Sequence, residues 1–175
     1  GVDPALTALA KEEGWVLVAQ HLNTLADIRT ALASLSVAIP DESARLRSAA
    51  IQSRIEAMMA VDVSVTAPDV ALVYSLDPCG VVGKGTYLDE VLKAAGGTNA
   101  LPLTGWLELS FEDLLRRDPD LVIFLGTSGV ERLESLPWNP KTRVATFDNP
   151  SALEPSTRAP NVMQQLADII EEHTR

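Results

Sequence analysis

Three short apolar segments constrain the fold of this chain more than any other feature of its sequence. They are VALVYS at 70–75, DLVIFLG at 120–126 and RVATFD at 143–148. Near-continuous apolar runs of this length are typical of strands that are covered on both faces. Segments with helical character lie between them, so strands and helices alternate along the chain. This order predicts an α/β fold, in which a mainly parallel sheet forms the middle of three layers.

Turn and capping residues mark the helices between and after these strands. A helix is predicted over Thr86–Ala95, and it stops at Gly96, where glycine adopts a left-handed backbone at little cost. Ser110 caps the short helix FEDLLRR. A short helix is predicted over Gly129–Leu133 and a final amphipathic helix over Asn161–His173.

The beginning of the chain follows a less complete pattern. A helix capped by Asp3 ends at Gly14, and the apolar run Trp15–Gln20 predicts a short buried strand. A lone strand cannot pair its own backbone groups. Residues 1–40 are therefore predicted to be the last part of another α/β lobe whose first part is missing.

A long helix separates this remnant from the regular part of the chain. Thr24 and Asp27 have the spacing of a capping box that opens a helix within the remnant. The long helix then runs over Glu42–Val61, with apolar residues at roughly helical spacing. The predicted division assigns 41–67 to this helix and a linker, and 68–175 to the C-terminal lobe.

The acidic composition excludes several classes of partner. Asp and Glu outnumber Lys and Arg by 24 to 14, which gives a net charge of −10. Nucleic-acid binding relies on basic side chains, so we expect no nucleic-acid partner. Adsorption to an anionic membrane surface is disfavoured for the same reason. No apolar run approaches the length of a membrane span.

The segment GKGT at Gly83–Thr86 looks like the start of a phosphate-binding loop, but its spacing is wrong. A Walker A loop requires Ser or Thr directly after the lysine, and here Lys84 is followed by Gly85. The glycine spacing of a dinucleotide-binding loop is also missing. The segment is better interpreted as a sharp turn from strand to helix.

Candidates for catalysis or metal binding are few. His21 and His173 are far apart, and neither suggests an acid–base pair. The single cysteine, Cys79, lies in the predicted loop SLDPCGVV, has no internal disulfide partner and excludes a multi-cysteine zinc site. We predict no catalytic residue, no metal ligand and no cofactor. The open alternative is an α/β enzyme that uses Cys79 or the Gly83–Thr86 loop.

Ligand binding has more support from the sequence. In open α/β sheets, ligands approach the loops at the carboxyl ends of the strands. Trp106 lies in the predicted linker LTGWLELS, where it is either a ligand contact or a core or lid residue. Tyr87, in the first turn of its helix, faces the same two alternatives. Glu112 lies in the first turn of its helix, where a carboxylate favours the dipole.

Five motifs together resemble the substrate-binding proteins of importers for iron-siderophores, haem and vitamin B12. They occur in the family's order, and the resemblance covers Val70 to about Ile170. They are GKGTYL, AGGTN, LSFEDLL, the strand start DPD and PSTR before the last helix. The resemblance implies two lobes joined by a rigid spine helix, here Glu42–Val61. It also implies binding without any bond made or broken, and therefore no enzyme.

The resemblance also implies roles for particular residues and partners. Trp106 matches an aromatic residue that lines the ligand cleft, and Glu112 matches a glutamate that docks on arginines of an ABC permease. Lys84, Gly85 and Tyr87 are the other candidate ligand contacts. The expected ligand is a metal chelate such as a ferric siderophore, haem or a corrinoid. The expected location is periplasmic or lipid-anchored outside the cytoplasm, and the incomplete N-terminal lobe predicts a possible dimer.

Overall fold

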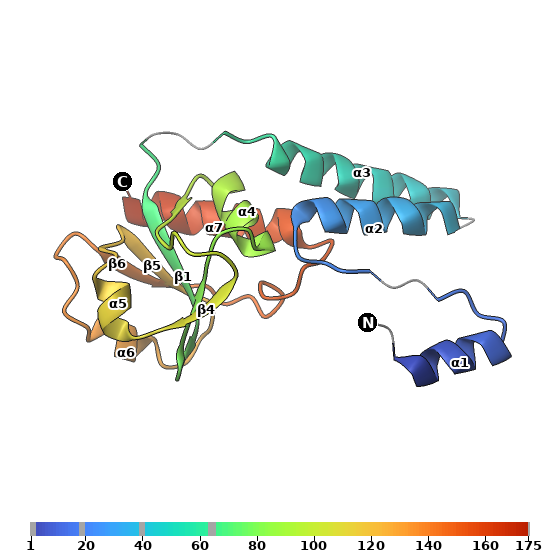
Figure 1. Ribbon diagram of the computed structural model, residues 1–175. Coiled ribbons are helices and arrows are strands. Elements are labelled where there is room, and N and C mark those ends of the chain that lie inside the picture. The colour runs from blue at the N-terminus through green and yellow to red at the C-terminus, as the bar shows by residue number, and fades with distance from the viewer. Residues whose placement is uncertain (1–2, 18–19, 39–40, 63–65, 175) are drawn as a thin grey trace.

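The computed structural model describes residues 3–17, 20–38, 41–62 and 66–174, in which helices come first and strands interleaved with helices follow from residue 69 (Figure 1). The elements are α1 Pro4–Glu12, α2 Leu25–Ala38, α3 Glu42–Met59, β1 Asp69–Leu76, β2 Cys79–Val82, α4 Tyr87–Ala94, β3 Thr98–Asn99, β4 Trp106–Leu109, α5 Phe111–Leu115, β5 Leu121–Phe124, α6 Val130–Glu134, β6 Arg143–Thr146 and α7 Ala159–Thr174.

One sheet with the order β4-β2-β1-β5-β6 organises the lobe, and β3 pairs with the beginning of β1. The ladders β1–β5, β5–β6 and β1–β3 are parallel. The ladders β1–β2 and β2–β4 are antiparallel. The predicted α/β fold with a mainly parallel sheet is confirmed. The antiparallel edge is a correction, because β2 and β4 lie in segments that the sequence analysis placed in a loop and a linker.

Helices cover both faces of this sheet, as the alternating side chains of β5 show. Leu121 and Ile123 point into a core shared with α4 and α7. Val122 and Phe124 point into a second core, where α5 contributes Leu114 and α6 contributes Leu133. Burial on both faces explains why the central strands are apolar at nearly every position.

Side-chain caps begin several helices, and the predicted caps at Thr24 and Ser110 are confirmed. The Thr24 hydroxyl accepts from the Asp27 amide at 3.1 Å, and the Asp27 carboxylate accepts from the Thr24 amide at 3.0 Å. Thr86 and Ser110 each accept from the amide three residues later. Gly96 has φ +92°, the left-handed conformation that ends α4. In the described ranges, no helix is both long and apolar enough to cross a membrane.

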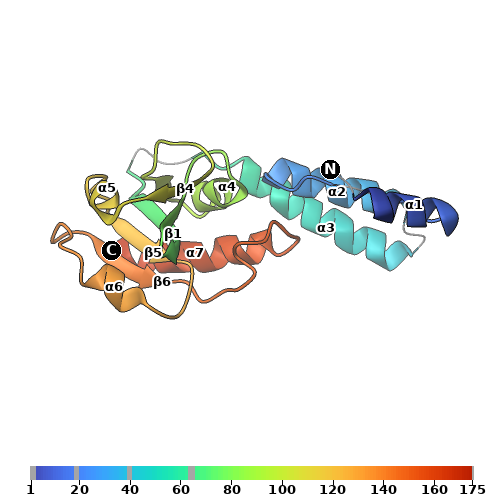
Figure 2. The ribbon, with the colours of Figure 1, turned by 60° about the horizontal axis from the view of Figure 1, so that its bottom comes forward.

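Helices α2 and α3 lie side by side and project from the lobe (Figures 1 and 2). Leu25 and Ile28 of α2 and Ile55 and Met58 of α3 are buried in the same core as α4 and α7. The Glu90 carboxylate on α4 accepts from the Leu25 amide at 2.6 Å, so the lobe satisfies a free donor at the start of α2. The helix pair is therefore joined to the lobe by a common core and by a cap.

Glu90→Ala is expected to lower the free energy of unfolding by about 1 kcal/mol, because it leaves the Leu25 amide without its acceptor. Urea unfolding measures this change. Glu134→Ala is the matched control, since Glu134 is exposed at the end of α6, and it should change stability by less than about 0.5 kcal/mol. Equal effects of the two substitutions would contradict a capping role for Glu90.

The predicted buried strand at 15–20 is wrong for the residues that are described. Residues 15–17 and 20 have no strand conformation, and residues 18–19 lie outside the described ranges. Trp15 is 58 % exposed and Val16 is 90 % exposed. The physical reason is that no described strand lies beside this segment, so an apolar run alone does not produce a strand.

Candidate functional site

The Gly83–Thr86 segment is held against the segment that leads into β4. The amides of Gly83 and Lys84 donate to the carbonyls of Gly105 and Leu103 at 2.8 and 2.7 Å, and the Gly105 amide donates back to Lys84 at 2.9 Å. A Cβ on Gly83 would lie 2.4 Å from the Leu103 carbonyl oxygen. Glycine is therefore required at position 83 for two backbone segments to approach each other.

Beneath this turn lies a buried carboxylate. Asp89 is 0 % exposed and accepts from the Gly85 amide at 3.0 Å, from Lys93 Nζ at 2.7 Å and from Asn99 Nδ2 at 3.1 Å. The Asn99 amide group also donates to the Val82 carbonyl. The motif residues of α4 and β3 thus form one polar network that fixes the turn, because a buried carboxylate is stable only when its oxygens are paired.

These contacts also show that the turn does not bind phosphate in this conformation. A phosphate loop presents free backbone amides to its anion. Here the amides of Gly83, Lys84 and Gly85 all donate to acceptors of the protein itself. A phosphate at this turn would also be repelled by the negative charge of the Asp89 carboxylate. The paired amides agree with the spacing argument against a nucleotide site.

Trp106 begins β4 on the edge of the sheet and does not lie in a linker. Its side chain is 46 % exposed. Its ring packs edge-to-face on the ring of Tyr74, with centroids 5.2 Å apart and planes at 78°. Sequence reasoning missed Tyr74, although its place at the carboxyl end of β1 was a usable signal. Gly80 makes room for it, since a Cβ there would lie 2.5 Å from the Tyr74 ring.

The environment of Tyr74 favours a neutral hydroxyl. Partial burial, together with the nearby carboxylate of Glu108, raises the pKa of Tyr74 above its usual value. A phenolate ligand to a metal needs the opposite environment. The Tyr74 hydroxyl donates to the Leu107 carbonyl at 3.5 Å, so Tyr74 is suited to contribute its ring at this site.

Three apolar side chains from neighbouring strands lie at one level of the sheet. Val73, Phe124 and Thr146 are paired across β1, β5 and β6, so the next residues, Tyr74, Leu125 and Phe147, stand side by side. All three pack on the core that includes α4 and α7. We call Trp106, Tyr74, Leu125 and Phe147 the candidate binding face; Leu125 and Phe147 are only 9 % and 3 % exposed. A pocket of about 200 Å³ opens at the far end of this face, beside Leu125 and Phe147.

Tyr87 lies inside the lobe, so the structure supports its core alternative and not the candidate ligand contact. It is 1 % exposed, and its hydroxyl donates to the Ala152 carbonyl. Burial is the main cause that raises the pKa of this phenol. Tyr87 thus supports the loop after β6 from below. The structure brings the turn with Lys84 and Gly85 close to the segment before Trp106, and keeps Tyr87 apart from them.

Glu112 projects from the first turn of α5, just beyond the end of β4. Its side chain is 82 % exposed, and its carboxylate lies 3.7 Å from the Arg116 guanidinium. Ser110 caps this helix and directly follows the four residues of β4. The strand and the cap together fix the position of Glu112 relative to Trp106. An exposed pair of this kind contributes little to stability. The carboxylate is accessible to a partner.

Cys79 belongs to β2 and not to a loop, which corrects the sequence analysis. It is 4 % exposed and faces the core beneath α5 and α6. Burial raises the pKa of its thiol. A nucleophilic cysteine needs an accessible site that lowers the thiol pKa, so Cys79 has the character of a core residue.

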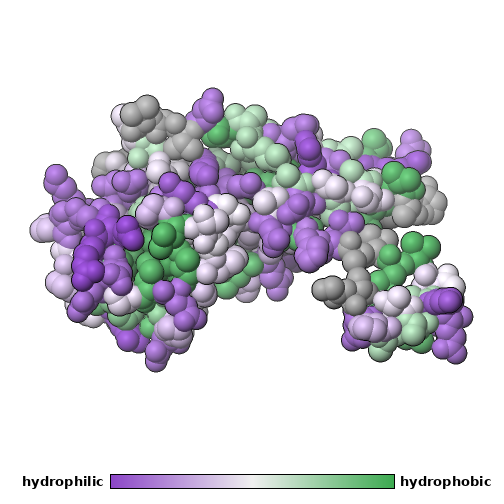
Figure 3. Space-filling view, in the orientation of Figure 1, coloured by the Kyte–Doolittle hydropathy of each residue, from purple (hydrophilic) through white to green (hydrophobic). Residues whose placement is uncertain are grey.

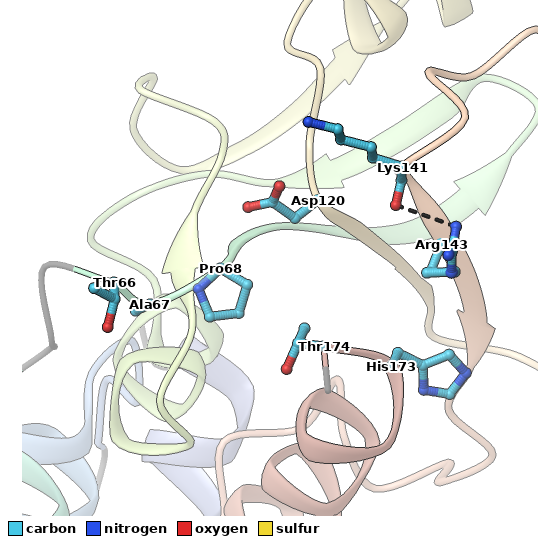
Figure 4. A pocket seen from close by; sticks show the side chains of 8 residues that line it. All are labelled: Thr66, Ala67, Pro68, Asp120, Lys141, Arg143, His173 and Thr174. Carbon is cyan, nitrogen blue, oxygen red and sulfur yellow. Dashed lines mark hydrogen bonds between the residues drawn. The ribbon is translucent and has the colours of Figure 1, made fainter.

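A larger cavity, of about 420 Å³, lies at the opposite end of the parallel strands, beside their amino ends (Figure 4). Arg143 and Asp120 from the amino ends of β6 and β5 contribute to it, with His173 from the end of α7. The Arg143 guanidinium donates to two carbonyls of its own loop, those of Pro140 and Lys141. This cavity is not part of the candidate binding face. No group of three or more His, Cys, Asp or Glu in the described ranges could hold a metal ion.

Neither a protein-family model nor a curated protein matches the sequence. Solved structures do. The periplasmic heme-binding protein RhuT from Roseiflexus sp. RS-1 matches 100 % of this chain and 74 % of its own, with TM-score 0.74 and 21 % identity. The chain has the fold of a periplasmic substrate-binding protein. The predicted resemblance is confirmed at the level of the fold.

Two further structures support the same fold. A protein from Staphylococcus epidermidis, described as a possible iron-binding, periplasmic solute-binding protein, matches 97 % of this chain and 70 % of its own, with TM-score 0.72 and 18 % identity. The vitamin B12-binding protein BtuF from Vibrio cholerae matches 100 % and 72 %, with TM-score 0.71 and 15 % identity. At these identities the likeness concerns the fold, and function must be argued from the residues.

Proposed function

We propose that this chain is the substrate-binding component of an ABC importer, working outside the cytoplasm and delivering a metal chelate to a permease. The observation that carries the proposal is the exposed Trp106 ring packed on the partly buried Tyr74, on a lobe whose fold is that of haem-, iron- and vitamin B12-binding proteins. A half-exposed tryptophan supported by a second aromatic ring offers a large apolar contact to a ring system.

The surroundings of Trp106 support the same role. The Asp89–Asn99 network fixes the turn at Lys84 and Gly85, and this turn pairs with the backbone just before Trp106. A rigidly supported aromatic side chain loses little entropy when a ligand binds. We propose Trp106 and Tyr74 as ligand contacts, with Lys84 and Gly85 at the rim.

We also propose the three-part division of the chain, with the N-terminal remnant at 1–40, the spine helix within 41–67 and the lobe at 68–175. Figure 3 shows hydrophobic surface on α1 and at the end of α2 and α3 that lies away from the lobe. The exposed apolar residues of α1, α2 and α3 include Leu6, Leu9, Leu35, Val37 and Leu46, and Trp15 and Val16 are exposed just after α1. Dimerisation through this surface stays a prediction.

Thermal unfolding distinguishes the binding function from a nucleotide-dependent enzyme. Hemin, cyanocobalamin or ferric ferrichrome should raise the unfolding temperature, since a ligand at a hundredfold excess over its dissociation constant adds about 2.7 kcal/mol. ATP with magnesium should not, because the amides of Gly83–Gly85 are already paired. Stabilisation by ATP and by none of the three chelates would contradict the proposal.

Glu112→Arg tests the docking role. Reversing the charge is expected to leave chelate binding within about twofold and to abolish transport, since rim charges control docking more than ligand affinity. Transport is measured in cells or vesicles that contain the permease. Asp168→Arg is the control, because Asp168 is exposed on α7. Loss of chelate affinity in Glu112→Arg would instead place Glu112 in the binding site.

A further inference from the structure

The pocket at the carboxyl ends of β5 and β6 differs in chemistry from the aromatic end of the candidate binding face. Its volume is about 200 Å³, and Leu125, Phe147 and Leu153 form its apolar wall. Thr127 and Asp148 contribute a hydroxyl and a carboxylate. Such a volume accommodates a substituent of a ligand and not a whole chelate.

The pocket is continuous with the aromatic pair. Leu125 and Phe147 stand beside Tyr74 at the same level of the sheet. Two strand spacings separate β1 from β6, so the row from Tyr74 to Phe147 spans roughly 10 Å. A flat ring system that lies on Trp106 and Tyr74 would therefore bring its edge to the mouth of this pocket.

Asp148 provides the only charged side chain among the described residues that line this pocket, and it is available to a ligand. The neighbouring Asn149 is committed, because its Nδ2 donates to Gln165 at 2.7 Å and its Oδ1 accepts from the Ser151 amide at 2.9 Å. Asp148 is exposed and has no hydrogen bond or ion pair to any described residue. The described residues lining the pocket include no Lys, Arg or His.

We propose, building on the binding function above, that this pocket selects an uncharged substituent that bears an N–H donor, such as a primary amide, and rejects a carboxylate. The Asp148 carboxylate accepts a hydrogen bond from an amide N–H, and this charged acceptor makes the bond stronger than a neutral one. A carboxylate in the same position would face like charge, with no cation in the lining to compensate. Leu125, Phe147 and Leu153 then pack on the aliphatic stem of the substituent.

Two small probes test this selectivity without any need for the whole ligand. Propionamide and sodium propionate have the same size and differ in charge. Each is titrated up to roughly 100 mM while the backbone amide signals of the protein are followed by NMR. Propionamide should shift the signals of Thr127 and Asn149 at about one tenth of the concentration that propionate requires. Asp148→Asn should bring the two probes within about twofold of each other, and Asp168→Asn should leave the preference unchanged.

The proposal is overturned if propionate shifts Thr127 and Asn149 at the same or lower concentration, or if neither probe shifts them. This outcome is separable from failure of the importer function. Selective propionamide binding combined with no chelate binding at Trp106 would reject the proposed function and keep the pocket. Chelate binding at Trp106 without amide selectivity would reject the pocket alone.

Discussion

Asp89→Ala is expected to lower the free energy of unfolding by about 3 kcal/mol, because one buried carboxylate satisfies three donors. The substitution leaves the Gly85 amide and the Asn99 side chain without this acceptor, and it removes the ion-pair partner of Lys93. Lys93 is partly exposed and can turn to water, whereas the Asn99 amide group is buried and cannot. Equilibrium unfolding in urea measures the loss.

Asp168→Ala is the matched control for this prediction. Asp168 also accepts a hydrogen bond from a side chain on its own helix, but it is exposed. Its removal should cost less than about 0.5 kcal/mol. If Asp89→Ala were as mild as the control, the motif around Gly83–Thr86 would not depend on a buried network, and its role as a support for Trp106 would be wrong.

Gly83→Ala is expected to cost about 3 kcal/mol for a different reason, which is steric. The added Cβ would lie 2.4 Å from the Leu103 carbonyl oxygen and 2.7 Å from that of Gly105. Both contacts are with backbone, so no side-chain rotation relieves them. The segment that leads into Trp106 must move, and we expect a change in tryptophan emission together with the loss of stability in urea.

Gly96→Ala separates this clash from the ordinary cost of replacing glycine. Gly96 has φ +92°, but a Cβ there meets no atom within 4 Å. The substitution should cost about 1 kcal/mol through backbone conformation alone and leave tryptophan emission unchanged. A Gly83→Ala protein that resembles Gly96→Ala in both respects would show that close approach of the two segments is not required.

The central strands and the helix caps were predictable because their signals are local. A continuous apolar run such as Leu121–Phe124 and a capping pair such as Thr24 and Asp27 depend on near neighbours in the sequence. The antiparallel edge was not predictable in this way. β2 and β4 have four residues each, and Gly80 weakens the first as a strand. β2 also pairs with β4, which lies more than twenty residues further along the chain.

The residues of the candidate site divide in the same way, into those with a local signal in the sequence and those that depend on the fold. Trp106 was found from its residue type and its resemblance to a family motif, but its exposure depends on its position on an edge strand. Tyr74 becomes a site residue only because the sheet brings it beside Trp106. Tyr87 was misplaced because the first turn of a helix does not reveal which way a side chain points. Asp148 could be recognised as a site residue only from the register between β5 and β6, which places it beside the end of β5.

The most direct test of the central claim is a fluorescence titration that isolates Trp106. The chain has three tryptophans, so the double variant Trp15→Phe/Trp138→Phe leaves Trp106 as the sole reporter. Hemin, cyanocobalamin and ferric ferrichrome are added in turn, with correction for their own absorption. The binding account predicts saturable quenching by at least one of them, and none in Trp15→Phe/Trp106→Phe. The account is contradicted if none of the three quenches Trp106. It is also contradicted if Trp15→Phe/Trp106→Phe, in which only Trp138 emits, is quenched to the same extent.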